Sequence, residues 1–175
     1  MLDFSYRLLQ LRRYIATVEA FISSNIARFP LSAEQWEQLL ESPELELEFG
    51  VSYEEFIETV EVFPEILRRS TFLISFILLE TSLNEICDNL QRKYSNPISV
   101  YDLRGRGIQR AAKYVRLLHG VNIKDTPLWQ DLCRIQELRN CIVHYSGRLN
   151  AGLLDQPIGR YIQSHSLLDL QPADP

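Results

Sequence analysis

Residues 137–147 read Glu-Leu-Arg-Asn-Cys-Ile-Val-His-Tyr-Ser-Gly. This stretch holds an Arg and a His five positions apart, with a polar residue directly after the Arg and a glycine three positions after the His. Upstream, a helical pattern reaches back to Pro127, and proline is common in the first turn of a helix. We therefore expect one helix over residues 127–146, ended by Gly147.

The predicted helix has two faces that differ in composition, at about 100° of rotation per residue. The apolar face, which we assign to the core, carries Leu128, Leu132, Ile135, Leu138, Ile142 and Tyr145. The second face carries Asn140, Val143 and His144, with Trp129 and Cys133 beside them. Such a mixture is not typical of a solvated helix surface, so we expect the second face to contact a partner.

The composition indicates an all-α fold. Of the 175 residues, 46% are apolar and 23% are charged, which is ordinary for a folded domain. Glycine (7) and proline (8) are sparse, and a clean alternation of apolar and polar residues is hard to find. We expect a single domain of four to five main helices over residues 1–165, with a loosely ordered tail over 166–175.

The cysteines and histidines give no sign of a metal or cofactor. The three cysteines form no C-x-x-C pair, as expected for buried thiols in a reducing cytosol. The three histidines are scattered, and no glycine-rich nucleotide-binding motif occurs. The most apolar stretch, 72–79, is too short to cross a bilayer, and the N-terminus does not resemble a signal peptide. We expect a soluble cytoplasmic protein without metal, cofactor or membrane contact.

The net charge of −5 is distributed unevenly along the chain. Residues 30–65 contain 11 Glu and no Asp, Lys or Arg, so the rest of the chain has 12 acidic residues against 18 basic ones. The sequence therefore predicts an acidic helical insert over 30–65 on a basic body. Fifteen of the 18 bases are Arg, whose planar fork suits phosphate.

Hydrophobic periodicity predicts the remaining helices. They are expected over 3–29, over 32–41, from 53 onward, over 65–94 and over 106–119. Pro64 either breaks the helix that starts at 53 or opens the next one in its first turn. Because residues 72–79 are apolar nearly all round, we place the 65–94 helix in the middle of the bundle. Gln156-Pro157 marks a turn beyond the last helix.

A basic stripe lies on the 106–119 helix and just before it. Its members are Arg104, Arg106, Arg110, Lys113 and Arg116. The opposite, apolar face carries Ile108, Ala111, Ala112, Val115 and Leu118. A stripe of this kind is often simply solvated. It also suits the backbone of an RNA, or contact with the acidic 30–65 segment of the same or a second chain.

The arrangement Arg139-Asn140-x3-His144, near the end of a helix in an all-helical chain, resembles the R-x4-H motif of the HEPN family. HEPN proteins are small helical domains, many of which are metal-independent ribonucleases. The resemblance rests on about ten residues and implies an up-and-down helical bundle. It also implies a homodimer in which two 127–146 helices bring both motifs to a shared cleft.

The same resemblance implies a reaction in which the 2′-OH of RNA attacks the adjacent phosphate, leaving a 2′,3′-cyclic phosphate and a 5′-OH. His144 would transfer protons, because imidazole titrates near neutral pH. Arg139 would stabilise charge on the phosphate, and Asn140 would orient the imidazole or bind the phosphate or sugar. Glu80 and Asn84 either hold these side chains in place or hydrogen-bond to a neighbouring helix.

Two further alternatives concern the motif itself. Five positions correspond to about 140° around a helix, so Arg139 and His144 converge only if the last turn loosens near Ser146-Gly147 or if two subunits form the site. In a purely structural alternative, Arg139 pairs with Glu137 or Glu80, and His144 stabilises the helix C-terminus as a cation.

Two functions follow. The first is an endoribonuclease and, more narrowly, a toxin or defence effector that a partner protein inhibits, with the 30–65 insert as the place for that control. The second is a catalytically inactive HEPN-like module that dimerises, binds RNA or a nucleotide, or interacts with another protein.

Overall fold

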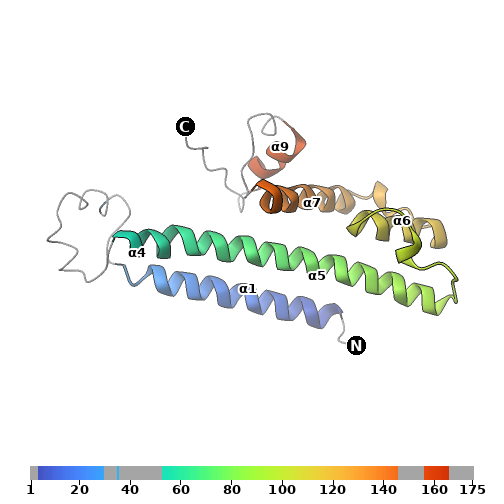
Figure 1. Cartoon of the computed structure of the whole chain (residues 1–175), viewed down its shortest axis with the longest axis horizontal. Coiled ribbons are helices and arrows are strands. Elements are labelled where there is room, and N and C mark those ends of the chain that lie inside the picture. Colours follow the sequence, from blue (N-terminus) through green and yellow to red (C-terminus); the bar gives the residue numbers. More distant parts are fainter. Residues whose placement is uncertain (1–3, 30–34, 36–52, 146–155, 166–175) are drawn as a thin grey trace. The chain divides into compact units, whose positions relative to one another are not determined.

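The computed structural model describes residues 4–29, 35, 53–145 and 156–165 (Figure 1). All regular structure in this part of the chain is helical, which confirms the all-α prediction. The expected 32–41 helix, most of the acidic insert and the 166–175 tail lie outside the described residues. The chain forms two compact units, residues 1–72 and 73–175, and the prediction of a single domain over 1–165 stays a prediction.

The first unit is built from α1 (Phe4–Ile26), α4 (Tyr53–Ile57), a π-helical turn (Glu58–Val62) and the first part of α5 (Phe63–Lys93). These bounds agree with the helices expected over 3–29, from 53 and over 65–94. Figure 1 shows α1 alongside the first part of α5.

Pro64 lies in the first turn of α5, directly after the π-helical turn. Proline has no N–H to donate, and its ring crowds the carbonyl one turn earlier. A π-helical turn widens the backbone at that point, so the helical path continues from Tyr53 to Lys93 without a break. Of the two sequence-based alternatives, the one in which Pro64 opens a helix is confirmed.

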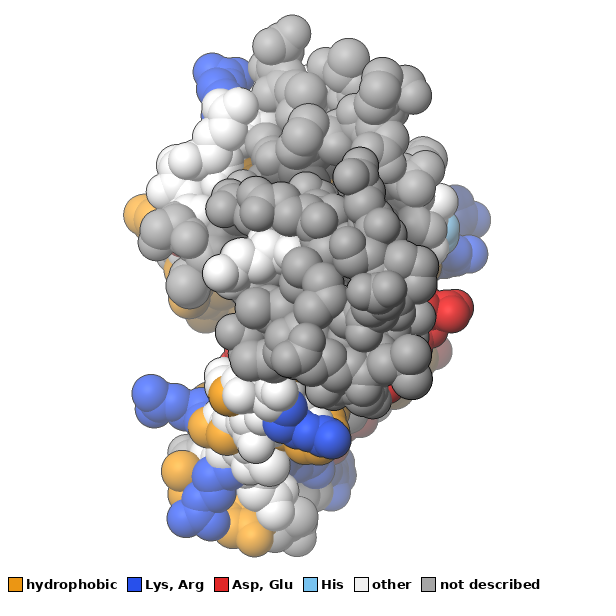
Figure 2. Space-filling model, turned by 90° about the vertical axis from the view of Figure 1, so that its left-hand side faces the viewer, with side chains coloured by type: hydrophobic (Ala, Val, Ile, Leu, Met, Phe, Trp, Pro, Cys, Tyr) orange, Lys and Arg blue, Asp and Glu red, His pale blue; other side chains and the backbone are white. Residues whose placement is uncertain are grey.

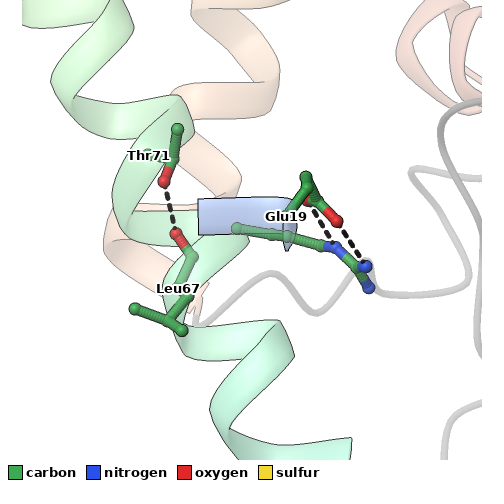
Figure 3. A network of polar contacts seen from close by, with 4 residues as sticks. Glu19, Leu67 and Thr71 are labelled. Atoms are coloured by element: carbon green, nitrogen blue, oxygen red, sulfur yellow. Dashed lines mark hydrogen bonds and ion pairs between the residues drawn. The ribbon is translucent and has the colours of Figure 1, made fainter. Parts of the chain in front are cut away.

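Polar and aromatic contacts join the elements of the first unit. Arg68 donates from Nε and Nη2 to the two carboxylate oxygens of Glu19, at 2.9 and 2.8 Å (Figure 3). The rings of Phe29 and Phe56 meet edge to face at 5.5 Å, and Phe56 is buried. The buried hydroxyl of Thr71 donates to the carbonyl of Leu67, so its polar group is satisfied within α5.

Much of the apolar surface of α1 is exposed. The exposed aromatic and aliphatic residues of this helix are Tyr6, Leu8, Leu9, Tyr14, Ile15 and Phe21. In the lower part of Figure 2, where α1 lies, hydrophobic side chains are interspersed with Lys and Arg. Ile22 of this helix is buried.

The second unit contains the rest of α5, two 3-10 turns (Val100–Asp102 and Ile123–Asp125) and three further helices. These are α6 (Gly107–His119), α7 (Pro127–Tyr145) and α9 (Pro157–Gln163). The predicted 106–119 and 127–146 helices agree with α6 and α7 within one residue. The chain bends at Gln156, as expected, but α9 was not predicted; it packs on α7 and buries Ile158 and Ile162.

Two buried clusters hold the second unit together. The first consists of Phe76, Ile108, Ala112 and Trp129, and the second of Cys87, Val100, Ala111 and Tyr114. They confirm the predicted apolar face of α6. Ile74 and Ile77 of α5 are 42% and 53% exposed, so α5 is not covered on all sides as its sequence led us to expect.

The faces predicted for the N-terminal part of α7 are wrong at three residues. Leu128, placed in the core from its periodicity, is 69% exposed, whereas Trp129, placed on the second face, is 7% exposed and belongs to the first cluster. Cys133, also placed on the second face, is half-buried and packs against that cluster. The core face of α7 is therefore rotated at its N-terminal end toward Trp129 and Cys133. None of the described helices combines the length and apolar content needed to cross a bilayer.

Candidate functional site

The last two turns of α7 carry the Arg-Asn-x3-His motif. Asn140 and His144 are exposed, Val143 is 45% exposed, and Arg139 is half-buried. These exposed positions, spaced three and four residues apart, form one edge of the helix, which we name the Asn140–His144 edge. Within a single chain this edge faces away from the core, as the predicted second face requires.

Arg139 donates from Nη1 to Oδ1 of Asn140, at 3.2 Å. The contact directs the guanidinium toward the exposed edge, since Asn140 lies on it. Four guanidinium N–H groups remain for other acceptors, because arginine carries five. The side chain that follows, Cys141, is 8% exposed, and burial raises the pKa of its thiol above the ordinary value, with a smaller contribution from the charge of Glu137.

Arg139 and His144 were expected to converge either through a loosened last turn near Ser146-Gly147 or across two subunits. The α-helix continues through both residues to Tyr145, so the turn that carries them is not loosened. The two side chains therefore leave the helix about 140° apart. Ser146 and Gly147 lie outside the described residues. Both routes to convergence therefore stay predictions.

The purely structural alternative for Arg139 is not realised among the described residues. Glu137 instead forms its ion pair with Arg134, at 3.3 Å between Nη1 and Oε2. Neither Glu137 nor Glu80 is paired with Arg139 in the part of the chain that the structure describes. The guanidinium is therefore available to an anionic ligand.

Glu80 lies where α5, α6 and α7 meet. Its carboxylate contacts Gly107, the first residue of α6, and a Cβ on that glycine would also lie 3.8 Å from Nε2 of Gln136 on α7. A carboxylate is favourable at a helix N-terminus, where backbone N–H groups are free. Gln136 precedes Arg139 by one helical turn, so Glu80 reaches α7 beside the motif rather than at it.

Asn84 lies one turn further along α5, and its Oδ1 is buried. This oxygen has no hydrogen-bond partner among the described residues. The expected hydrogen bond from Asn84 to a neighbouring helix is thus not formed by this atom.

The five predicted basic residues separate into two groups. Arg104, Lys113 and Arg116 line a cavity of about 330 Å³, which we name the α6 cavity. Arg106 is the exposed residue preceding the first turn of α6 and does not line the cavity. Arg110 also lies outside it, with its guanidinium 5.0 Å from the centre of the Tyr101 ring.

Lys124 is a member of the α6 cavity that sequence reasoning missed. It lies in the 3-10 turn Ile123–Asp125, which opens where Oδ1 of Asn122 accepts from the Lys124 N–H. This turn packs back on α6, so the ammonium reaches Oε1 of Gln109 at 2.9 Å. Helical periodicity could not predict that Lys124 lines the cavity, because Lys124 lies in the turn between α6 and α7 and on neither helix.

The other two histidines make local contacts. The ring of His119 lies 5.1 Å from that of Tyr94 and 6.3 Å from that of Tyr114, at the end of α6. Nδ1 of His165 lies 2.8 Å from the carbonyl of Tyr161. In the described ranges, no three His, Cys, Asp or Glu side chains are placed to hold a metal ion together.

The second unit therefore presents two places with different chemistry. The Asn140–His144 edge combines an imidazole, an amide and a neighbouring guanidinium, which are groups for proton transfer and anion stabilisation. The α6 cavity gathers four cations and contains no titratable base near neutral pH. Comparison with protein-family models, with curated proteins and with solved structures gives no match for this chain.

Proposed function

We propose that this chain is a metal-independent endoribonuclease that cleaves RNA at the Asn140–His144 edge. The observation that carries the proposal is that Arg139 and Asn140 are hydrogen-bonded to each other while His144 is exposed one turn later. An imidazole can act as a general acid or a general base in proton transfer. A guanidinium without a carboxylate partner in the described residues presents two parallel donors to a phosphate.

The reaction needs no group beyond these side chains and the RNA. One His144 imidazole removes the proton of the 2′-OH as that oxygen bonds to phosphorus. The bond from phosphorus to the 5′-oxygen breaks, and an imidazolium protonates the leaving oxygen. Arg139 stabilises the charge that develops on the phosphate oxygens. The products are a 2′,3′-cyclic phosphate and a 5′-OH.

The division of proton transfer between two imidazoles leads to a homodimer. In one chain the side chains of Arg139 and His144 leave α7 about 140° apart, so a second copy supplies the missing partner. The Asn140–His144 edge also includes Val143, an exposed apolar side chain suited to the centre of such a contact. The dimer would be isologous, with the same edge on both chains.

A toxin or defence effector is the biological role that fits such an enzyme, because uncontrolled RNA cleavage harms the cell. Its activity would be held in check by a partner protein. The acidic 30–65 segment is where we place that control, since a run of glutamates competes with RNA for basic surface.

The test is cleavage of an unstructured RNA by the purified protein in excess EDTA. We expect 2′,3′-cyclic phosphate ends, loss of cleavage in His144→Ala, and a loss of about 10²-fold or more in Arg139→Ala. Two matched variants serve as controls: His165→Ala, and Arg134→Ala on the same helix, both of which should cleave normally. Melting temperatures should stay close to wild type, because His144 is exposed. Intact RNA, or equal cleavage by His144→Ala, would contradict the proposal.

A second candidate is an RNA-binding or dimerisation module without catalysis. It is favoured by the α6 cavity, where four cations converge without a proton-transfer group. In that case the protein would retain RNA on a filter or gel while leaving it intact. Binding would also weaken steeply with salt, as contacts to phosphates do.

A further inference from the structure

We propose that the α6 cavity is a binding site for a compact polyphosphate group, that is, two or three phosphates in a linear chain. Four cations line it: Arg104 from the loop before α6, Lys113 and Arg116 from α6, and Lys124 from the following 3-10 turn. The site is separate from the Asn140–His144 edge, and the inference does not depend on RNA cleavage.

The charges in the cavity are uncompensated. No acidic side chain lines it, and none of its four cations forms an ion pair with a carboxylate in the described part of the chain. All four cations are exposed, and like charges that line one concave surface repel one another. An anion with several charges relieves this repulsion, whereas a single phosphate relieves only part of it.

Lys124 is held in position by neutral partners. Its ammonium donates to Oε1 of Gln109 at 2.9 Å and lies 5.6 Å from the ring centre of Trp129, which is itself buried. The other end of the Gln109 amide donates to Sγ of Cys133, at 3.5 Å, which turns its oxygen toward the lysine. The amide of Gln109 holds the ammonium in place without neutralising its charge. The full charge therefore stays available to a ligand, and less side-chain entropy is lost when the ligand binds.

The dimensions of the cavity favour a compact ligand over a long backbone. Its volume of about 330 Å³ is at the small end of the range for ligand sites, which begins at about 300 Å³. Leu117, which is 56% exposed, adds an apolar surface beside the cations on which a base or ribose can pack. A triphosphate chain occurs both in a nucleoside triphosphate and at the 5′ end of an RNA, and both sources present the same group.

The first test is calorimetric titration of the protein with inorganic tripolyphosphate and with GTP. We expect saturable binding of both, weakened about tenfold or more in Lys124→Ala and Arg116→Ala. Lys93→Ala is the matched control, because this exposed lysine of the same unit lies outside the cavity, and its binding should equal wild type. Lys113→Ala, another exposed position, provides a further variant if either of the first two fails to fold.

A second test concerns the role of Gln109. Gln109→Glu would give Lys124 a carboxylate and place a negative charge in the cavity, so we expect tripolyphosphate binding to fall at least tenfold. Gln109→Met keeps the size without the charge and should lower binding much less. Equal losses in the two variants, or no binding of tripolyphosphate to the wild type, would overturn the inference.

Binding of short RNAs with different 5′ ends distinguishes the two sources of the phosphate chain. These measurements use the His144→Ala variant, so that the RNA stays intact. If a 5′-triphosphate RNA binds more tightly than GTP, the RNA end is the ligand; if the two bind equally, the free nucleotide is. Tripolyphosphate should compete with either. Two results together would show that the inference is wrong: a 5′-OH RNA that binds as tightly as the 5′-triphosphate RNA, and no competition from tripolyphosphate. In that case the cavity binds the extended backbone of an RNA strand.

Discussion

Gly107 and Glu80 are in direct contact at the start of α6, with the carboxylate of Glu80 in the space that a Cβ on residue 107 would take. Gly107 also has φ +52°, in the left-handed region that costs an L-residue about 1–2 kcal/mol. Gly107→Ala should therefore lower the free energy of unfolding by about 1–2 kcal/mol, most of it backbone strain, because the Glu80 carboxylate is the far end of a flexible side chain and can move aside. Urea unfolding followed by circular dichroism measures the change.

Gly120→Ala is the matched control for this substitution. Gly120 ends α6 at φ +66°, and no atom lies within 4 Å of its missing Cβ. Only the strain of a left-handed backbone applies at Gly120, so we expect the free energy of unfolding to fall by about 1 kcal/mol. A loss in Gly107→Ala much larger than the loss in Gly120→Ala would show that the Glu80 carboxylate cannot move aside.

Tyr114→Phe is a second stability prediction. The Tyr114 side chain is fully buried, and its hydroxyl donates to the carbonyl of Ile98 at 3.1 Å. Removing the hydroxyl leaves that carbonyl without this donor, which should lower the free energy of unfolding by about 1–2 kcal/mol. Tyr101→Phe is the control, because Tyr101 is 59% exposed, and it should have no measurable effect. A Tyr114→Phe protein as stable as wild type would contradict the role of this hydrogen bond.

The three cysteines should react with alkylating reagents in a defined order. Burial raises the pKa of Cys87 to about 11, with a smaller contribution from the charge of Asp88, and the residue is 1% exposed. Because the thiolate is the reactive form, Cys87 should stay unmodified at pH 8 in the folded protein. Cys133 is half-buried and should react first, followed by Cys141, whose pKa is also raised by burial.

Mass spectrometry of peptides after timed iodoacetamide treatment would establish this order. In urea all three cysteines should react alike, which is the internal control. Reaction of Cys87 at the same rate as Cys133 in the native protein would show that the second unit opens near Ala111, where the thiol of Cys87 contacts the backbone carbonyl.

The helices of the second unit could be predicted because proline and glycine residues mark their ends. Pro127 opens α7 and Gly120 ends α6, and the apolar spacing between such residues identified the buried Ile108, Ala111 and Ala112. Local sequence was sufficient there because each boundary depends on the backbone preference of a single residue.

The errors have a different origin, in contacts between elements. Leu128 and Trp129 are adjacent in the sequence. Trp129 is the buried one because the Ile123–Asp125 turn packs against it. The apolar periodicity of α7 gives no information about this turn, which lies outside the helix. The same turn brings Lys124 to the α6 cavity. Helix α9 has seven residues, too few for a periodicity to emerge. At the candidate site, the exposure of Asn140 and His144 followed from periodicity, whereas the Arg139–Asn140 hydrogen bond did not.

The ion pair between Glu19 and Arg68 gives the first unit a small dependence on pH. The hydrogen bonds from Arg68 lower the pKa of Glu19 below 4.5, so the pair stabilises the folded state above that pH and loses this effect as pH falls through the lowered pKa. Because the two side chains are 43% and 56% exposed, the effect should not exceed about 1 kcal/mol. Glu19→Gln should therefore melt slightly below wild type at pH 7, and the two melting curves should converge below pH 4.5. In an Arg68→Met background the Glu19→Gln substitution should make no difference at either pH, and a difference that persisted there would assign the effect to another partner of Glu19.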